Sequence, residues 1–505
     1  MRLPFPERIP ILYATCFAGL LCLAQLLQGT SAVIALCCFL FIVIATFAFN
    51  LAGGFTRASG GYIFFYAVLA VIVGISWKAF LGEQAGSNLK QPVLTFQVYL
   101  GGIVAMLAAV FFSRKLTLKR PLLANTVTNE NMLSAATGCL VVGLALVVIA
   151  SVIPHQAGSL ISAVNQLNAF IPLAIILGTI AQIRRSNGTS SVNLPVLLAM
   201  GVLFVMGLVG FSKQAMFTPP LCWLIAAASQ RYRISLYQGL GFVLAMVFMG
   251  YYLVPYSGYG KNALSDSFSE NVSTAISMLS NLQGIRDQAD QLPEAVIEDR
   301  VQAYFDTPQG FFDRLQMISP DDALINVTEE NGSIGYVPVL MDFGNLIPHF
   351  LWPGKPTVAF GNIYAHEIGM IGADDVTTGI SFSPTGEAFH LGRWMGIVVV
   401  APVLWTMLFV IFDSLCGDVR MYPWGLLGIV MFAHEAPEGM LNGLIHTAGI
   451  GALAIVVAAF ASSYVMPIIG ALVSTPERTR LRRIAPIRSI QRRLPPAPPP
   501  QNSGL

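Results

Sequence analysis

The sequence predicts an all-α polytopic membrane protein with about twelve transmembrane helices and one large helical loop. Three observations lead to this fold class: a low charge content, a series of long apolar stretches, and an uneven distribution of basic residues. Of the 505 residues, 55% are hydrophobic and only 11% are charged, whereas soluble proteins carry about 25% charged residues. Because only a surface that faces lipid tolerates so few charges, the composition excludes a soluble enzyme, a disordered chain and a fibrous repeat.

The apolar stretches define the predicted spans. A helix needs about 20 apolar residues to cross a bilayer, and twelve stretches are candidates. The eighth and eleventh are short, and the twelfth is long enough to tilt. The stretches cover residues 10–28, 31–49, 61–81, 93–113, 132–153, 161–182, 192–211, 216–230, 236–254, 394–415, 422–433 and 442–470.

The basic residues predict the orientation of these spans, because Lys and Arg are enriched in cytoplasmic loops. With the N-terminus inside, 19 of the 28 Lys and Arg residues fall on inner loops and tails. Twelve spans return the C-terminus to the same side, so both termini are expected in the cytoplasm. Residues 471–505 form a basic, Pro-rich tail, which we expect to contact anionic lipid headgroups.

One connection is far longer than the others and divides the chain into residues 1–254, 255–393, 394–470 and the tail. Residues 255–393 hold 18 acidic and six basic residues and face outward in this topology. A loop of such length in a compact bundle is usually functional. The apolar spacing predicts helices over 268–282, from Pro293 onward, and over 311–318, the last ending before Pro320. The apolar composition of residues 334–347 predicts a helix at the membrane. Residues 348–393 are rich in Gly, Pro, Thr and Ser, which predicts an ordered coil.

Cofactor and metal motifs are missing from the sequence. The six histidines all fall on the outer side and have no HExxH spacing, and the chain has neither a Walker A loop nor a GxGxxG motif. We therefore expect no cofactor, no metal and no nucleic-acid partner. The seven cysteines lie in or beside apolar runs, so no disulfide framework is expected.

Four cations are candidates for binding an anionic group. Lys213 follows Gly-Phe-Ser between two apolar runs, and Arg314 lies in the apolar segment 311–318 beside Asp313. Lys213 could equally snorkel at a helix end, and Arg314 could form a local ion pair with its neighbour. Arg286 and Arg300 stand among acidic residues, where solvated ion pairs are the simpler interpretation.

The segment before the tenth span is dense in conformationally restricted residues. It contains IPHFLWPGKP (347–356), GNIYAHEI (361–368) and TTGISFSPTGEAFHL (377–391). Trp and Phe favour the membrane interface. Glu387 is the only carboxylate between Asp375 and the span. We expect it to be held at the membrane surface as a proton acceptor, with a helix-capping role as the alternative.

These residues resemble the bacterial oligosaccharide repeat-unit polymerases, the Wzy-like O-antigen and exopolysaccharide polymerases. The resemblance rests on the large outer loop before the tenth span, the arginine in 311–318, and the motifs IPHFLWPGKP and TTGISFSPTGEA. It is strongest over residues 205–400. Many relatives have Pro-Arg where Pro348 is followed here by His349, so His349, Lys355 and Arg314 are alternative cations.

The resemblance implies a metal-independent glycosyltransferase with a GT-C-like bundle in the bacterial inner membrane. Such enzymes join undecaprenyl-pyrophosphate-linked oligosaccharides at the periplasmic face, and a flippase and a chain-length regulator are the protein partners it suggests. Cations must stabilise the pyrophosphate leaving group, and a base must accept the proton of the acceptor hydroxyl. The expected catalytic residues are Glu387, Arg314, Lys355 and His349, and the expected substrate-binding residues are Lys213, His366, Arg393, Arg286 and Arg300. His349 and His366 are alternative bases.

Two other functions remain open from the sequence. An O-antigen ligase uses the same lipid donor but transfers the glycan to lipid A-core. A secondary transporter or flippase of lipid-linked saccharide has a similar number of spans. Transporters usually carry ionisable residues near the bilayer midplane and have two similar halves. The predicted spans here hold few charges, and the two halves differ by the long loop.

Overall fold

A computed structural model describes residues 1–124, 130–152, 168–290 except 266, and 303–473 except 350, 353, 357, 373 and 377. Within these residues the regular elements are helices, and no strand is present. The helices up to the outer loop are α1 (Ile11–Leu27), α2 (Ala32–Ala52), α3 (Ala58–Phe65), α4 (Val73–Leu81), α5 (Pro92–Leu116), α6 (Met132–Val152), α8 (Phe170–Arg185), α9 (Leu194–Val209), α10 (Lys213–Ser229), α11 (Leu236–Phe248) and α12 (Val254–Asn262).

The remaining helices belong to the outer loop and to the C-terminal part of the bundle. They are α13 (Phe268–Ser280), α14 (Leu282–Asp290), α15 (Ile318–Asn331), α16 (Val337–Asn345), α17 (Phe360–Glu367), α18 (Pro384–Met395), α19 (Ala401–Cys416), α20 (Trp424–Glu438), α21 (Met440–His446), α22 (Ala452–Phe460) and α23 (Met466–Val473). A short 3-10 turn, η5, covers Phe312–Arg314.

Seven helices in the described part of the chain are long and apolar enough to cross a membrane, which supports a helical polytopic membrane protein. They are Ala32–Ala52, Ala58–Leu81, Pro92–Leu116, Met132–Ile149, Leu236–Asn262, Pro384–Cys416 and Met440–Val473. Each of the other predicted spans also meets a helix, but α1, α8, α9, α10 and α20 have only 15 to 17 residues. The structure thus confirms the all-helical membrane architecture and leaves the number of twelve spans a prediction.

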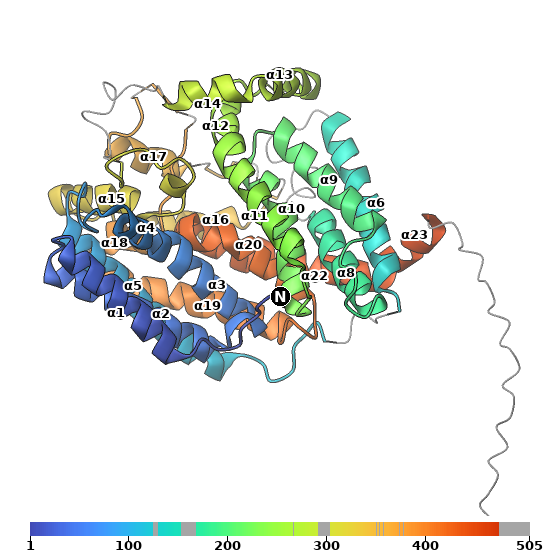
Figure 1. The fold of residues 1–505 in the computed structure, drawn as a ribbon, viewed down its shortest axis with the longest axis horizontal. Helices are drawn as coiled ribbons and strands as arrows, with labels where there is room; N and C mark the ends of the chain where they lie inside the picture. The colour runs from blue at the N-terminus through green and yellow to red at the C-terminus, as the bar shows by residue number, and fades with distance from the viewer. Residues whose placement is uncertain are drawn as a thin grey trace, which may run out of the picture.

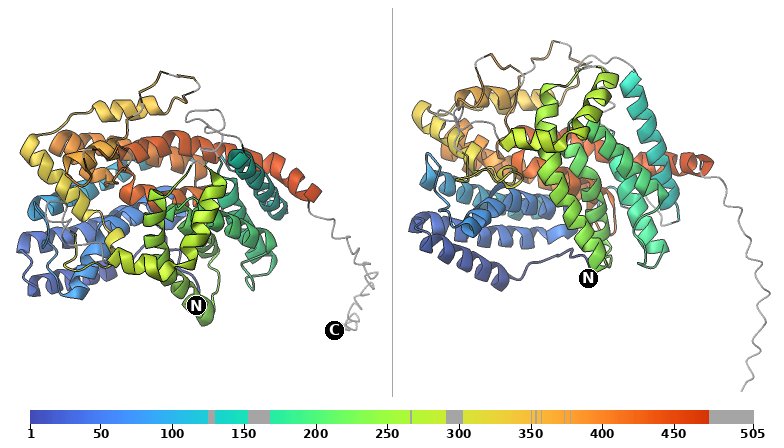
Figure 2. Two further views of the ribbon diagram at one scale, coloured as in Figure 1. Left: turned by 90° about the horizontal axis from the view of Figure 1, so that it is seen from above. Right: turned by 45° about the horizontal axis from the view of Figure 1, so that its top comes forward.

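The bundle has two groups of helices joined by a central one (Figure 1). On one side α1, α2, α5 and α19 pack in sequence, and on the other α6, α8, α9 and α10 pack together with α23 against α6. The two groups lie on opposite sides in every view (Figure 2). Helix α20 contacts α3, which packs against α2 and α19 of the first group, and it contacts α8 and α10 of the second. The residues at the end of α20 can therefore meet residues from both halves of the chain.

Buried polar side chains fix the first group. The Asp413 carboxylate in α19 accepts hydrogen bonds from the Ser59 hydroxyl at 2.6 Å and the Ser59 N–H at 3.2 Å, and both residues are buried. Trp405 donates to the Tyr62 hydroxyl at 3.2 Å in the same interface. Because unpaired polar groups are costly in an apolar interior, these bonds hold α19 against α3 in one register.

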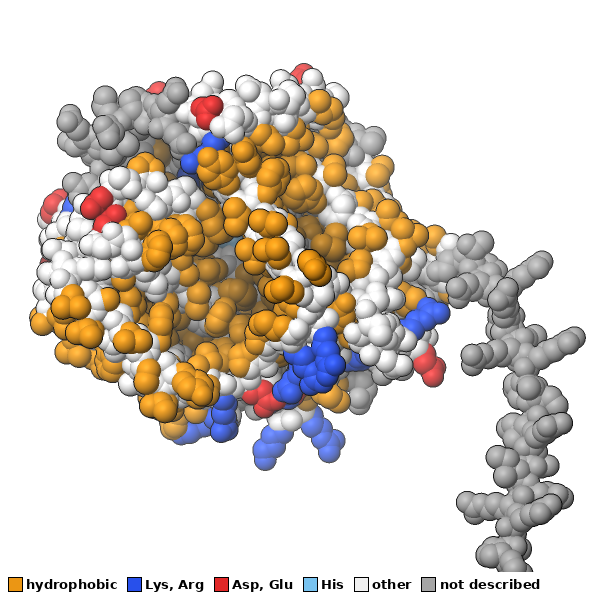
Figure 3. Space-filling view, viewed as in Figure 1, with side chains coloured by type: hydrophobic (Ala, Val, Ile, Leu, Met, Phe, Trp, Pro, Cys, Tyr) orange, Lys and Arg blue, Asp and Glu red, His pale blue; other side chains and the backbone are white. Residues whose placement is uncertain are grey.

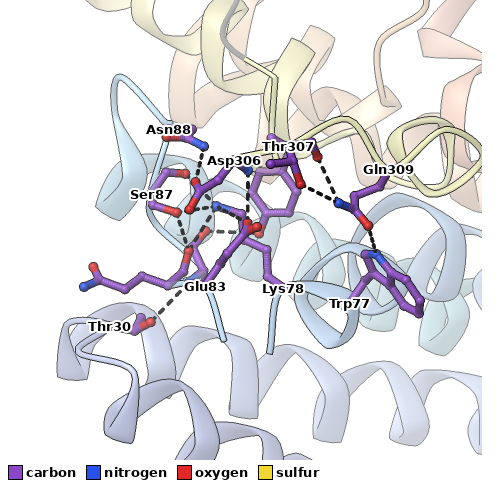
Figure 4. A network of polar contacts seen from close by, with 12 residues as sticks. Thr30, Trp77, Lys78, Glu83, Ser87, Asn88, Asp306, Thr307 and Gln309 are labelled. Atoms are coloured by element: carbon purple, nitrogen blue, oxygen red, sulfur yellow. Dashed lines mark hydrogen bonds and ion pairs between the residues drawn. The ribbon is translucent and has the colours of Figure 1, made fainter. Parts of the chain in front are cut away.

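A second network joins the end of α4 to the outer loop (Figure 4). The Lys78 ammonium is fully buried, donates to the Ser87 carbonyl at 2.9 Å, and lies 4.4 Å from the centre of the Tyr304 ring. Nearby, Asn88 donates to the Asp306 carboxylate at 2.7 Å. These contacts hold the segment after α14 against the bundle, directly before Arg314.

The outer loop is more helical than the sequence suggested. The first predicted helix is present as α13 and α14, and residues 334–347 contain α16. The helix expected from Pro293 lies outside the described residues. The prediction for 311–318 is wrong, because only the turn η5 forms there and α15 begins at Ile318. Pro320 then occupies the first turn of α15, where a missing N–H costs no helical hydrogen bond.

The predicted coil over 348–393 is also wrong, since it contains α17 and α18. Helix α18 begins with Ser383, whose hydroxyl accepts from the Gly386 N–H at 3.0 Å, followed by Pro384 in the first turn. The backbone breaks at Gly392 and Arg393, where Arg393 has a φ of 50°. The sequence-predicted start of the tenth span, residue 394, thus coincides with this break inside a longer helix.

The orientation of the chain is open to a direct test. Ser280 is exposed at the end of α13, at the top of Figure 1. We expect a single cysteine at position 280, in a background without the native cysteines, to react with a membrane-impermeant maleimide from the periplasmic side. A cysteine at position 489 should react only after the membrane is opened. Labelling of position 280 from the cytoplasmic side alone contradicts the topology.

Candidate functional site

A cavity of about 510 Å³ opens where the two groups of helices meet at α20. Hydrophobic side chains make up most of its wall, and Figure 3 shows a hollow lined by such side chains near the middle of one face. Much of the wall comes from α8, α9, α10, η5, α20 and the helical residues 447–460 after α21, and the helical turn Tyr66–Ile72 between α3 and α4 adds Leu69. Its hydrophobic members include Leu69, Pro172, Leu203, Phe217, Leu221, Phe311, Leu427, Met431 and Ile450.

Polar groups reach this cavity from several separate segments. Residues 212–215 at the start of α10 line it, and so do Arg314 from η5 and the His434–Glu438 pair from α20. The side chain of Ser212 caps α10 by accepting from the Ala215 N–H at 3.3 Å, which places Lys213 in the first helical turn. A mainly apolar cavity with a few polar groups is the usual form of a small-molecule site.

The Lys213 ammonium lies in the electric field of several charged neighbours. Its pKa is lowered to about 8, chiefly because burial disfavours the charged form, and further by the positive charges of Arg314 and Lys261. The Glu438 carboxylate acts in the opposite direction. The ammonium is still largely protonated at neutral pH, and an anion in the cavity would favour its charged form.

Lys213 and Arg314 are unpaired among the residues that the structure describes: neither side chain makes a hydrogen bond or an ion pair there. The expected alternative for Arg314, a pair with its neighbour, does not form, because the Asp313 carboxylate instead accepts from the Gln309 N–H at 2.8 Å. Two cations are thus available to an anionic group at the wall of an apolar cavity.

Two histidines and one glutamate of the cavity were not predicted from the sequence. His434 Nδ1 lies 2.8 Å from Glu438 Oε1, and both side chains are about one-third exposed. His446 contributes to the wall from the end of α21. The segment AHEAPEG could have predicted the His434–Glu438 pair, because these residues are four positions apart and share one face of a helix.

Glu387 lies away from this cavity. It is fully buried in α18, and its two oxygens accept hydrogen bonds from the Tyr364 hydroxyl at 3.2 Å and the Leu441 N–H at 2.5 Å. The sequence placed this carboxylate at the lipid headgroup level. That depth stays a prediction. In the structure its hydrogen bonds join α18 to α17 and α21.

The outer-loop cations also have partners of their own. The Lys355 ammonium donates to the carbonyls of Asn345 at 3.2 Å and Ile347 at 2.8 Å, so it closes the end of α16. The Arg393 guanidinium forms an ion pair with Glu329 at 2.8 Å. None of these charges belongs to the wall of the cavity.

The other predicted binding residues are dispersed. His366 Nε2 lies 3.0 Å from the Asp375 carbonyl oxygen, and His349 is half-buried in the turn after α16. The Arg286 guanidinium lies over the Tyr251 ring, 4.4 Å from its centre. Arg300 lies outside the described residues. Of the nine predicted site residues, the structure therefore brings Lys213 and Arg314 to one cavity.

The described residues contain no cluster of three or more His, Cys, Asp or Glu side chains placed to bind a metal ion. Comparison with known proteins gives no relative: no family model, curated protein or solved structure matches this chain.

Proposed function

We propose that this protein is a membrane glycosyltransferase that polymerises undecaprenyl-pyrophosphate-linked oligosaccharide repeat units into a surface polysaccharide. One observation carries the proposal: an apolar cavity in a bundle of membrane-type helices presents two cations, Lys213 and Arg314, that have no hydrogen-bond or ion-pair partner within the described part of the chain. A lipid pyrophosphate has the matching chemistry, because its chain is apolar and its headgroup is anionic.

The chemistry of glycosyl transfer gives these cations a role. When the anomeric carbon leaves the pyrophosphate, negative charge grows on the phosphate oxygens. Preorganised positive groups stabilise such charge, and loss of one contributing group typically lowers turnover by about 10²–10³-fold. The Arg314 guanidinium can bind two phosphate oxygens at once, whereas the Lys213 ammonium acts as a point charge.

The proposal predicts the effect of removing each cation. We expect Lys213→Ala and Arg314→Ala to lower polymer formation by at least 10²-fold while the protein remains in the membrane, and Arg314→Lys to retain part of the activity. Purified protein in nanodiscs, supplied with undecaprenyl-pyrophosphate-linked repeat units, gives the product length by gel electrophoresis.

Lys119→Ala is the matched control, since this exposed lysine lies outside the cavity. Polymer of normal length in both cavity variants contradicts the proposal. Transfer of the glycan to lipid A-core, without chain extension, identifies an O-antigen ligase instead.

A further inference from the structure

The last turn of α20 presents an acid–histidine pair to the cavity that holds Lys213 and Arg314. His434 and Glu438 stand four residues apart on one face of the helix, with 2.8 Å between His434 Nδ1 and Glu438 Oε1. Both side chains line the cavity, and each keeps about one-third of its surface exposed. The pair is therefore accessible from the cavity.

The neighbouring carboxylate of Glu435 points elsewhere. A Cβ atom on Gly443 would lie 2.5 Å from Glu435 Oε2, and one on Gly439 would lie 2.7 Å from it, so this carboxylate packs on the backbone of α21. Glu435 is not part of the cavity wall. Within the described residues, Glu438 is the carboxylate that the cavity wall contains.

Resting on the proposed function, we propose that Glu438 accepts the proton of the acceptor hydroxyl and that His434 positions its carboxylate. The hydroxyl proton moves to a Glu438 oxygen while the hydroxyl oxygen forms a bond to the anomeric carbon of the donor. The bond between that carbon and the phosphate oxygen breaks, and its electron pair leaves with the pyrophosphate. Lys213 and Arg314 stabilise the charge of this leaving group.

Other acids of the described chain are less suited to this step because they do not line the cavity. Both oxygens of Glu387 accept hydrogen bonds within the fold, and one oxygen of Asp313 accepts from the Gln309 N–H. Glu438 instead shares one cavity with the two cations, so a donor and an acceptor bound there can reach the proton acceptor and the leaving-group site together.

The test separates turnover from binding. We expect Glu438→Gln to lower polymer formation by about 10²–10⁴-fold, the usual contribution of a general base. Binding of undecaprenyl pyrophosphate to the same variant in nanodiscs should stay within about twofold of wild type. Glu330→Gln, which removes an exposed acid of α15 outside the cavity, is the control and should leave both measurements unchanged.

Variants of His434 test its positioning role. We expect His434→Ala to lower turnover and His434→Asn to restore part of it, because the Asn amide can donate to Glu438 from near the position of the imidazole Nδ1. A structural role alone would give equal losses in both variants, accompanied by a lower melting temperature.

The outcomes distinguish this inference from the proposed function. Normal polymerisation by Glu438→Gln overturns the inference while the polymerase function stands. Loss of undecaprenyl pyrophosphate binding in Glu438→Gln also overturns it, because the residue then acts in binding or folding. If the wild-type protein neither binds undecaprenyl pyrophosphate nor extends the repeat unit, the proposed function itself fails.

Discussion

We expect Glu387→Ala to lower the free energy of unfolding by about 2–6 kcal/mol. The substitution leaves the Tyr364 hydroxyl and the Leu441 N–H buried without their acceptor. Each buried donor that loses its partner costs about 1–3 kcal/mol. Because this carboxylate joins α18 to α17 and α21, the loss should loosen the contact between the outer loop and the bundle.

Glu387→Gln separates the loss of hydrogen bonds from the loss of the acidic group. Gln keeps an oxygen for the Leu441 N–H and nearly the same volume, so we expect its melting temperature in nanodiscs to lie much closer to wild type than that of Glu387→Ala. Equal melting temperatures for all three proteins contradict this account. Polymerisation by the folded Gln variant also decides the role that the sequence gave to this residue, because a base at position 387 requires that activity to be lost.

We expect the stability of the protein to fall as the pH rises from about 4 to about 7, with Asp321 as a main cause. Burial raises the pKa of this aspartate to about 7, although hydrogen bonds from Ser383 and from the Tyr99 hydroxyl at 2.5 Å partly oppose the shift. An unfolded aspartate has a pKa of about 3.9. The folded state thus binds the proton more tightly than the unfolded state. The stabilisation from the protonated carboxyl group is complete below the pKa of the unfolded state, and it is lost as the pH rises through the pKa of the folded state.

The Asp321 effect is large because the group is fully buried. A difference of about three pKa units corresponds to a stability change on the order of 4 kcal/mol. Asp321→Asn is neutral at every pH and keeps an acceptor for the Ser383 N–H. Its melting temperature, measured in nanodiscs from pH 4.5 to 8, should vary less than that of wild type. Parallel curves for the two proteins would exclude Asp321 as a source of the pH dependence.

The sequence alone determined the class of structure. Few charges and a series of long apolar stretches require helices in lipid, because a helix satisfies its own backbone hydrogen bonds. Each predicted span accordingly meets a helix in the described chain. The sequence also marked Lys213 and Arg314 as candidate cations, since a cation flanked by apolar residues can be recognised without any knowledge of tertiary contacts.

Local composition gave a wrong prediction of secondary structure where tertiary packing decided the conformation. Residues 348–393 are rich in Gly, Pro, Ser and Thr, which disfavour helices on average. Helix α18 nevertheless forms there, because Ser383 and Pro384 suit a helix start and the helix is then buried against α15 and α21. Its burial also encloses Glu387, whose oxygens accept hydrogen bonds from Tyr364 and Leu441, two contacts that the sequence did not predict.

Only the tertiary structure decided which polar residues share a site. Lys213, Arg314 and Glu438 lie about one hundred or more positions apart, and no local spacing brings such residues together. Helix α20 contacts both halves of the bundle and thereby places the His434–Glu438 pair at the same cavity as the two cations. Lys355 instead donates to two carbonyls within ten positions of the chain, so its contacts are local. Arg393 pairs with Glu329 of α15, 64 positions away, and only the fold brings these two residues together.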